Sequence, residues 1–348
     1  MKEDRPAEEA LVPPGAAFFP VPDPGKTRKF ALVLVPGFTL LAFSSAVEPL
    51  RIANQLSQRP LYQWRVLSEA GGAVASSSGI KVVADSRLAP LDRETDLYIC
   101  AGNPPSAAAA PGIVGAVQRH HRFGGRVGGI CTGAVALAHA GVLTDRRFTL
   151  HWENQPAFAE DFPDLAPTEG RFEIEGRTLT CGGGAASTDM MLSLIASDHG
   201  TEFAAMVSEM CLRTVLTGVE PEQRSSLAAL MRTRNPGLIL VAKLMSDHLE
   251  DTLSLDELAS VVGRSRRHIE RLFMTTLGVT PSAFYRGLRL DRARNLLGTT
   301  DMTLLEIATA CGFSSVSHFS KSFKARYGTL PTRFAHQARL SRSGMSTG

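Results

Sequence analysis

One cysteine of this chain occupies a position at which α/β enzymes often place a nucleophile. Cys131 lies between a short glycine-containing apolar run, RVGGI (126–130), and a helical run that begins at Thr132. A sharp turn from strand to helix would expose the thiol at the amino end of the helix, where the helix dipole lowers a thiol pKa. The pattern therefore predicts a nucleophile elbow, whose chemistry could be thiol hydrolysis or reversible oxidation.

Neighbouring segments carry groups that could work with this thiol. Gly102 and Asn103 follow the apolar run DLYICA and could turn backbone N–H groups toward Cys131, as an oxyanion hole does. His151 ends the predicted strand RFTLHW (147–152) and is a candidate base or ligand-binding group.

Each of these groups also has a purely structural interpretation. Glu48, at the start of a predicted helix, could reach the thiol, but it could equally complete a capping box with Ser45. Pro49 would then suit the first turn of that helix. His151 and Trp152 could simply end a strand, and the cysteine could be packed in the core.

The carboxyl-terminal third carries a second set of functional residues, in a pattern that occurs twice. ELASVVGRSRRHIERLF (257–273) matches EIATACGFSSVSHFSKSF (306–323) at glutamate, alanine and glycine positions, and after a one-residue insertion at serine, histidine and phenylalanine positions. The offset between the copies is 49 to 50 residues, which indicates one structural unit used twice.

Each copy has the signals of a helix-turn-helix. Ser254-Leu-Asp-Glu257 and Thr303-Leu-Leu-Glu306 are predicted capping boxes, and Gly263 and Gly312 are expected to end the resulting helices with positive φ. A serine in each copy would then cap a second helix, which in this motif enters the major groove. The alternative is a small helical bundle whose basic residues are only solvated. The candidate DNA-binding residues are Ser265, Arg266, Arg267, His268, Arg271, Ser315, Ser317, His318, Lys321 and Lys324.

Upstream of the repeat, short apolar runs alternate with helical patterns. This alternation predicts an α/β fold with a doubly wound, mostly parallel sheet, followed by an all-α domain with two helix-turn-helix units. Ligands of such sheets bind outside the carboxyl ends of the strands, which is where Cys131 would lie. The predicted strands are 29–35, 64–69, 96–102, 126–130, 147–152 and 172–181, and the predicted helices are 45–57, 107–119, 132–140 and 189–199.

Composition and local sequence signals suggest how the chain is divided into domains and linkers. The Pro-, Ala- and acid-rich start lacks a signal-peptide pattern, and no apolar run approaches the roughly 20 residues of a membrane helix. Five scattered cysteines without a CxxC pair suit a reducing cytoplasm and predict no metal site. The predicted parts are a flexible tail (1–28), a sensor and dimerisation domain (29–216), a linker (217–236), a DNA-binding domain (237–338) and a tail (339–348).

Charge is distributed unevenly between these parts. Residues 236–348 hold fifteen Lys and Arg residues against nine Asp and Glu, a net charge of +6. The remaining residues hold 22 basic and 25 acidic side chains, a net charge of −3. A basic third on an acidic body favours a nucleic-acid-binding module attached to something else.

Residues 237–338 closely resemble the AraC/XylS-type DNA-binding domain. The likeness is carried by RLDRARNLLGTTDMTLLEIATACGFSSVSHFSKSFKARYGTLPTRF (289–334). It implies two helix-turn-helix units bridged by a long helix, here about 281–297, that read two successive stretches of the major groove.

Residues 29–216 resemble the PfpI-like branch of the class I glutamine amidotransferase superfamily, which has a flavodoxin-like sandwich. The likeness is carried by VLVPGF, AVEPLRIAN, GGICTGAVALAHAGVL and HWENQPAFAEDFPDL. Joined to an AraC-type domain, it resembles the GlxA family of transcriptional regulators. The resemblance implies that Glu48 is a pocket acid and Cys131 the elbow cysteine. Hydrolytic relatives usually carry histidine after that cysteine, where this chain has Thr132, so catalysis is not expected.

The HWEN and EPLRIAN runs most closely resemble regulators of amino-acid and quaternary-amine catabolism, which implies an effector such as arginine, carnitine or glycine betaine. A quaternary ammonium needs aromatic faces and a carboxylate, which two phenylalanines, a tryptophan and a glutamate could supply. The predicted effector pocket comprises Phe38, Phe43, Glu48, Gly102, Asn103, Cys131, Thr132, His151 and Trp152.

These patterns together predict a cytoplasmic, nucleoid-associated transcriptional regulator. It is expected to act as a homodimer and to activate rather than repress transcription. Its expected partners are promoter double-stranded DNA, a small-molecule effector and, for an activator, RNA polymerase, with no membrane, cofactor or metal. The alternatives are a thiol hydrolase or amidase tethered to DNA, and a cysteine-based redox sensor. The missing histidine disfavours the hydrolase, and nothing in the sequence separates the regulator from the redox sensor.

Overall fold

The computed structural model describes residues 10–15, 17–21, 25–212 and 235–344. The chain divides into two compact units, residues 1–223 and 224–348, and each is described by itself. Almost all of the predicted linker, 217–236, lies outside the described residues.

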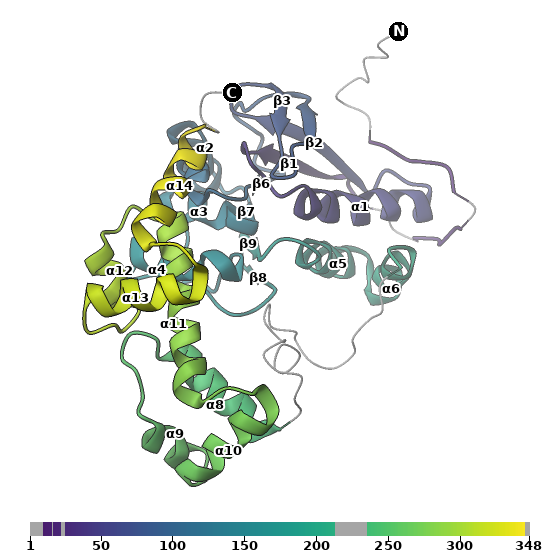
Figure 1. Cartoon of the computed structure of the whole chain (residues 1–348). Helices are drawn as coiled ribbons and strands as arrows, with labels where there is room; N and C mark the ends of the chain where they lie inside the picture. Colours follow the sequence, from purple (N-terminus) through teal and green to yellow (C-terminus); the bar gives the residue numbers. More distant parts are fainter. Residues whose placement is uncertain (1–9, 16, 22–24, 213–234, 345–348) are drawn as a thin grey trace. The chain divides into compact units, whose positions relative to one another are not determined.

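The first unit is built on a seven-stranded sheet with the order β5-β2-β1-β6-β7-β9-β8 (Figure 1). Every neighbouring pair is parallel except β8 and β9, which form an antiparallel hairpin at one edge. The fold class is the predicted one. The strands are β1 (Arg28–Leu34), β2 (Tyr62–Ser68), β5 (Ser86–Arg87), β6 (Thr95–Cys100), β7 (Val127–Ile130), β8 (Phe172–Glu175) and β9 (Thr178–Cys181).

Two helical layers cover the two faces of this sheet. Strands β6 and β7 are buried at every residue, because alternate side chains enter one core on each face. A separate hairpin, β3 (Gly72–Ala75) and β4 (Lys81–Ala84), lies beside the sheet. One layer holds α1 (Leu40–Ser57), α5 (Ala186–His199) and α6 (Thr201–Met210). The other layer holds η1 (Pro105–Ala109), α2 (Pro111–Arg122), η2 (Cys131–Gly133) and α3 (Ala134–His139). Two short helices, η3 (Trp152–Asn154) and α4 (Gln155–Asp161), follow in the same layer.

Helix α1 begins five residues earlier than predicted, at Leu40. The alternative in which Ser45 and Glu48 form a capping box is therefore wrong, and Pro49 lies inside the helix rather than in its first turn. A proline there removes the N–H that would bond to the Ser45 carbonyl four residues earlier. That carbonyl instead accepts a hydrogen bond from Thr188 Oγ1 of α5, at 3.0 Å. The side chain of a neighbouring helix thus satisfies the group that the proline leaves free.

The segment RFTLHW (147–152) was predicted as a strand and is not one. The position beside β7 is taken by β9, so this segment has no strand to pair with. The Thr149 N–H donates to the side-chain oxygen of Thr180 rather than to a backbone carbonyl, at 2.9 Å.

Residues ahead of β1 that were predicted as part of a flexible tail contact α1. The Phe19 N–H donates to the carbonyl of Leu56 at 2.8 Å, and its ring lies 5.6 Å from that of Phe203 in α6. Asn54 of α1 donates to the carbonyl of Leu11 at 2.8 Å. This part of the segment is held on the helical layer.

The second unit is entirely helical over its described residues, as predicted. Two helix-turn-helix repeats, α9–α10 and α12–α13, are joined by the long helix α11 (Figure 1). The helices are α8 (Pro236–Asp247), α9 (Leu255–Val261), α10 (Arg266–Leu277), α11 (Pro281–Thr299), α12 (Leu304–Ala310), α13 (Val316–Tyr327) and α14 (Pro331–Gly344).

Candidate nucleic-acid interface and sensor site

The first helix of each repeat begins with the predicted capping box. Ser254 Oγ accepts from the Glu257 N–H at 3.2 Å, and the Glu257 carboxylate accepts from the Ser254 N–H at 2.7 Å. Thr303 and Glu306 make the same two bonds at 3.3 and 2.6 Å. These bonds hold the pKa of both glutamates below its ordinary value, because they stabilise the charged carboxylate.

The turn of each repeat depends on a glycine in the left-handed region. Gly263 has φ 61° and Gly312 has φ 66°, which confirms the conformation expected from the sequence. The second helix of each repeat is then capped by serine: Ser265 Oγ accepts from the His268 N–H at 3.3 Å, and Ser315 Oγ accepts from the His318 N–H at 3.2 Å.

Buried rings and aliphatic side chains decide which face of α10 and α13 is free. Ile269 and Phe273 of α10 and Phe319 and Phe323 of α13 are 0–2% exposed, so they anchor one stripe of each helix in the core. The polar residues between them face outward. The predicted DNA-contact residues that are exposed are Ser265, Arg266, Arg267, Arg271, Ser315, Ser317, His318, Lys321 and Lys324, whereas His268 is half-buried.

The exposed cations of α10 differ in their surroundings. The Arg266 guanidinium pairs with Glu270 at 3.1 Å, one turn along the helix, and lies 3.7 Å from Asp256. Arg267, His268 and Arg271 line a concave surface of about 550 Å³ on α10. Arg266 therefore supports the repeat internally, and Arg267 and Arg271 are better placed to reach DNA.

Helix α11 is tied to the second repeat by side-chain bonds. Arg326 of α13 donates to both carboxylate oxygens of Asp291, at 3.0 and 2.9 Å. Arg289 of α11 donates to the carbonyl of Cys311 at 2.7 Å and also to that of Gly312 in the turn. These contacts fix α13 on the bridging helix.

In the first unit, the carboxyl ends of four adjacent strands meet around Cys131. The residue has φ 61°, which is rare for a side chain of this size and confirms the predicted elbow. The thiol is 5% exposed, and its Sγ lies 3.5 Å from Thr39 Oγ1. Burial raises the Cys131 pKa to about 11, so the prediction that the helix terminus would lower it is wrong. Burial is the main cause of this rise, because it removes water from the charged thiolate.

Thr132 and Gly102 contact each other, as their shared place in the predicted pocket suggested. The Thr132 hydroxyl donates to the Gly102 carbonyl at 2.7 Å, and the Thr132 side chain is fully buried. The residue that replaces the histidine of hydrolytic relatives therefore links η2 to the loop after β6. Asn103, the next residue of that loop, is exposed.

Two residues of this site were missed by the sequence interpretation. Thr39 ends the loop after β1, and Gly183 lies in the loop after β9, where a Cβ would come within 2.7 Å of the Cys131 Cβ. Thr39 directly follows the apolar run VLVPGF, and Gly183 comes two residues after TLTC, so the rule that ligands bind at carboxyl strand ends could have found both.

Three further predicted pocket residues, His151, Trp152 and Glu48, differ in their contacts and exposure. His151 caps η3: its Nδ1 accepts from the Glu153 N–H at 3.4 Å, and burial lowers its pKa. Its backbone N–H donates to the Cys131 carbonyl at 3.3 Å, and Trp152 is 40% exposed. Glu48 pairs with the neighbouring Arg51 at 2.7 Å, and half of its side chain is exposed.

The two predicted phenylalanines lie together. The rings of Phe38 and Phe43 meet edge to face at 5.8 Å, and Phe38 is fully buried. Glu48 follows Phe43 by five positions on α1, which is about 7.5 Å along the helix axis and about 140° around it. Phe43 and Glu48 therefore lie on different sides of α1.

Comparisons with known proteins agree with both units. Residues 28–197 match the DJ-1/PfpI family, and residues 258–337 match a helix-turn-helix domain family. The HTH-type transcriptional regulator CdhR of Pseudomonas aeruginosa is 44% identical over 88% of this chain and 91% of its own length. The chain belongs to the GlxA family of transcriptional regulators.

Two further relatives support this assignment to the GlxA family. The regulator GlxA of Rhizobium meliloti is 40% identical over 89% of this chain and 96% of its own length. The regulator GbdR of Pseudomonas aeruginosa is 40% identical over 87% of this chain and 83% of its own length. This GlxA-family chain is therefore a DNA-binding transcriptional regulator of the AraC type. Within its described residues, no helix is long and apolar enough to cross a membrane.

Proposed function

We propose that this GlxA-family regulator binds promoter DNA as a homodimer, with α10 and α13 of each chain in the major groove. A small metabolite bound near Cys131 would control that binding, and RNA polymerase would be a further partner if the regulator activates transcription. The observation that supports DNA contact by these helices is the repeat itself. Two capped helix-turn-helix repeats each present a second helix with one buried stripe and one exposed basic face.

The two second helices are suited to different kinds of contact. An arginine can bind guanine through two hydrogen bonds, so Arg267 and Arg271 of α10 are proposed to read bases. Lys321 and Lys324 of α13 are point charges on flexible stems, which suit phosphate groups. Ser265, Ser317, His268 and His318 are proposed to make shorter-range contacts to the backbone or base edges.

A retardation experiment with fragments from upstream of the gene tests this function. The specific site is expected to bind with a Kd of roughly 10⁻⁸ to 10⁻¹¹ M at physiological salt. Arg267→Ala should cost about 1–3 kcal/mol of binding free energy and relax the preference at one base pair. Arg266→Ala is the matched control, since Arg266 is already paired with Glu270. Equal weakening on all DNA sequences would make Arg267 a phosphate contact, and no retardation of any fragment would overturn the proposal.

The effector is proposed to bind at the carboxyl edge of the sheet, where Thr39, Gly102 and Cys131 meet. The thiol's raised pKa and burial disfavour both alternatives, the hydrolase and the redox sensor, because each requires an accessible thiolate. An amino acid or quaternary amine such as arginine, carnitine or glycine betaine remains the proposed ligand class, from the likeness of the HWEN and EPLRIAN runs.

Calorimetry on the full chain with these three compounds tests the effector class. A binding compound should release heat that Thr39→Val reduces, and Trp152→Ala should reduce it further if the exposed indole closes over the ligand. No heat with any of the three compounds would rule out this class.

A further inference from the structure

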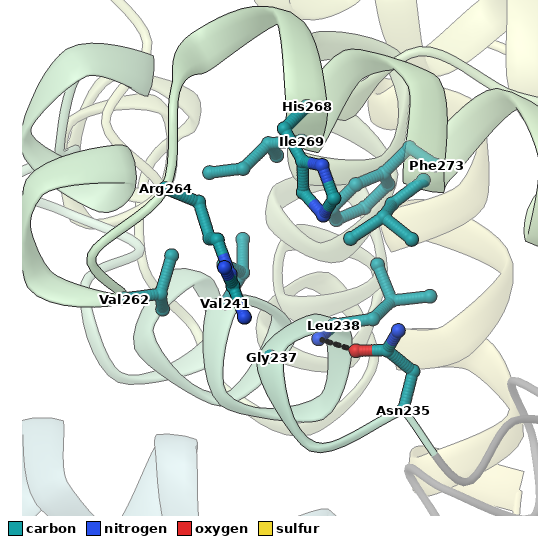
Figure 2. A pocket seen from close by; sticks show the side chains of 10 residues that line it. Asn235, Gly237, Leu238, Val241, Val262, Arg264, His268, Ile269 and Phe273 are labelled. Atoms are coloured by element: carbon teal, nitrogen blue, oxygen red, sulfur yellow. Dashed lines mark hydrogen bonds between the residues drawn. The ribbon is translucent and has the colours of Figure 1, made fainter.

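The DNA-binding unit contains a cavity between α8 and the first repeat. Its volume is about 180 Å³, and Leu238 and Val241 of α8 face Ile269 and Phe273 of α10 across it. These four side chains are 0–2% exposed, so the floor of the cavity is apolar. Figure 2 shows Arg264 and His268 reaching over the cavity from one side, and Leu238 and Asn235 on the other.

The second repeat shows what fills the equivalent space. Gly263 and Gly312 occupy the same place in the two turns, and so do the residues that follow them. The Arg264 N–H donates to the carbonyl of Ala259 at 3.0 Å, and the Phe313 N–H donates to the carbonyl of Ala308, the matching alanine, at 2.8 Å. Phe313 is therefore the structural counterpart of Arg264.

Phe313 places its ring in the core of the second repeat. The ring is 5.4 Å from that of Phe319 and 5.7 Å from that of His318, and the Arg289 guanidinium covers it at 4.2 Å. In the first repeat the residues matching Phe319 and His318 are Ile269 and His268, and both line the cavity. The first repeat thus lacks one aromatic ring that the second repeat has.

The rim of the cavity is polar and includes the cationic side chain of Arg264. Arg264 contributes a guanidinium and His268 an imidazole, while α8 begins at the cavity with Pro236 and Gly237 and adds the positive end of its dipole. None of the described residues that line the cavity is acidic. An apolar floor under a polar rim with a cationic side chain fits a small molecule with a ring at one end and one negative charge at the other.

We propose that this cavity binds a small aromatic monocarboxylate, with its ring in the place that the Phe313 side chain takes in the second repeat and its carboxylate on Arg264. The volume is sufficient, because an apolar protein cavity of about 150 Å³ is known to bind benzene. His268 lines both the cavity and the concave DNA-facing surface of α10, so an occupant would hold its imidazole in place. DNA affinity should rise, since ordering a contact residue in advance lowers the entropic cost of binding.

The binding step is tested without DNA, so it can fail or succeed independently of the proposed function. The full chain is titrated into 4-fluorobenzoate and followed by ¹⁹F NMR, with 4-fluorobenzyl alcohol as the uncharged comparison. Wild-type protein should broaden and shift the benzoate signal in a saturable way and bind the alcohol at least tenfold more weakly. Equal binding of the two compounds would overturn the role of the carboxylate.

Three variants distinguish loss of the binding site from loss of the fold or of surface charge. Arg264→Phe copies the second repeat, fills the cavity and removes the cation, and should abolish saturable binding while thermal unfolding stays cooperative. Arg264→Ala keeps the space and should weaken binding at least tenfold. Arg286→Ala removes an exposed cation of α11 outside the cavity and should change nothing. Wild-type affinity in Arg264→Phe would overturn the site.

Retardation with operator DNA tests the regulatory consequence. Saturating benzoate should tighten wild-type binding at least threefold and leave Arg264→Phe unaffected. Unchanged wild-type affinity would overturn the link between the cavity and DNA recognition.

Discussion

At the scale of single residues, Cys131 shows how burial can outweigh a favourable backbone position. The elbow conformation, with φ 61°, is the one that exposes a nucleophile in many enzymes, yet the thiol is 5% exposed beside Thr39. The loop after β9 approaches so closely that Gly183 has no room for a side chain. The sequence predicts the turn, because glycines and an apolar strand are local signals. It does not predict the burial, which depends on loops from three other strands.

The raised pKa of Cys131 leads to a prediction about its reactivity. With a pKa of about 11, the thiolate fraction at pH 8 is about 0.001, and it rises about tenfold per pH unit. Alkylation by iodoacetamide in the folded protein should therefore be slow at pH 8 and accelerate tenfold between pH 8 and 9. Peptide mass spectrometry gives the rate, and urea-unfolded protein is the control, in which Cys131 should react at the rate of an ordinary thiol. Rapid labelling of the folded protein at pH 7 would contradict the buried state.

At the scale of elements, the two repeats were predictable almost residue by residue, whereas α1 was not. Capping boxes and turn glycines are signals within four residues of the helix end they define, and both repeats use them as expected. Helix α1 contains a serine, a glutamate and a proline in the order of a helix start, but these residues lie in its interior. The start was mistaken because Thr188, 143 residues away, supplies the hydrogen bond that makes an internal proline tolerable.

This bond between α1 and α5 predicts that substitutions at Thr188 and Pro49 have non-additive effects on the free energy of unfolding. Thr188→Val removes the hydroxyl but keeps the shape, which leaves the partly buried Ser45 carbonyl without its donor and should cost about 1 kcal/mol or more of unfolding free energy. In a Pro49→Ala background the backbone N–H of residue 49 can bond to that carbonyl, so the same substitution should cost at least 1 kcal/mol less. Urea unfolding of the wild type, the two single variants and the double variant gives the four free energies of unfolding that this double-mutant cycle needs. Additive effects would show that the hydroxyl does not replace the missing backbone bond.

At the scale of the whole molecule, the two units of the chain differ in charge as well as in fold. The helical third carries a net charge of +6 and the rest a net charge of −3. A charged surface of this kind supplies affinity for any DNA sequence, and a few directed side chains supply selectivity. Under the proposed function the two repeats divide these contributions, since α10 offers Arg267 and Arg271 and α13 offers Lys321 and Lys324.

Salt dependence distinguishes these two contributions in the intact protein. If Lys321 and Lys324 neutralise phosphates, the double variant Lys321→Ala/Lys324→Ala should flatten the slope of log K against log salt by about 2. Its loss of affinity should be similar on specific and unrelated fragments, because phosphates carry no sequence information. Arg267→Ala should instead lower the ratio of specific to non-specific binding. Retardation at a series of salt concentrations gives both quantities. A lysine variant that lost only specific binding, with its slope unchanged, would make α13 the base-reading helix and reverse the proposed roles of the two repeats.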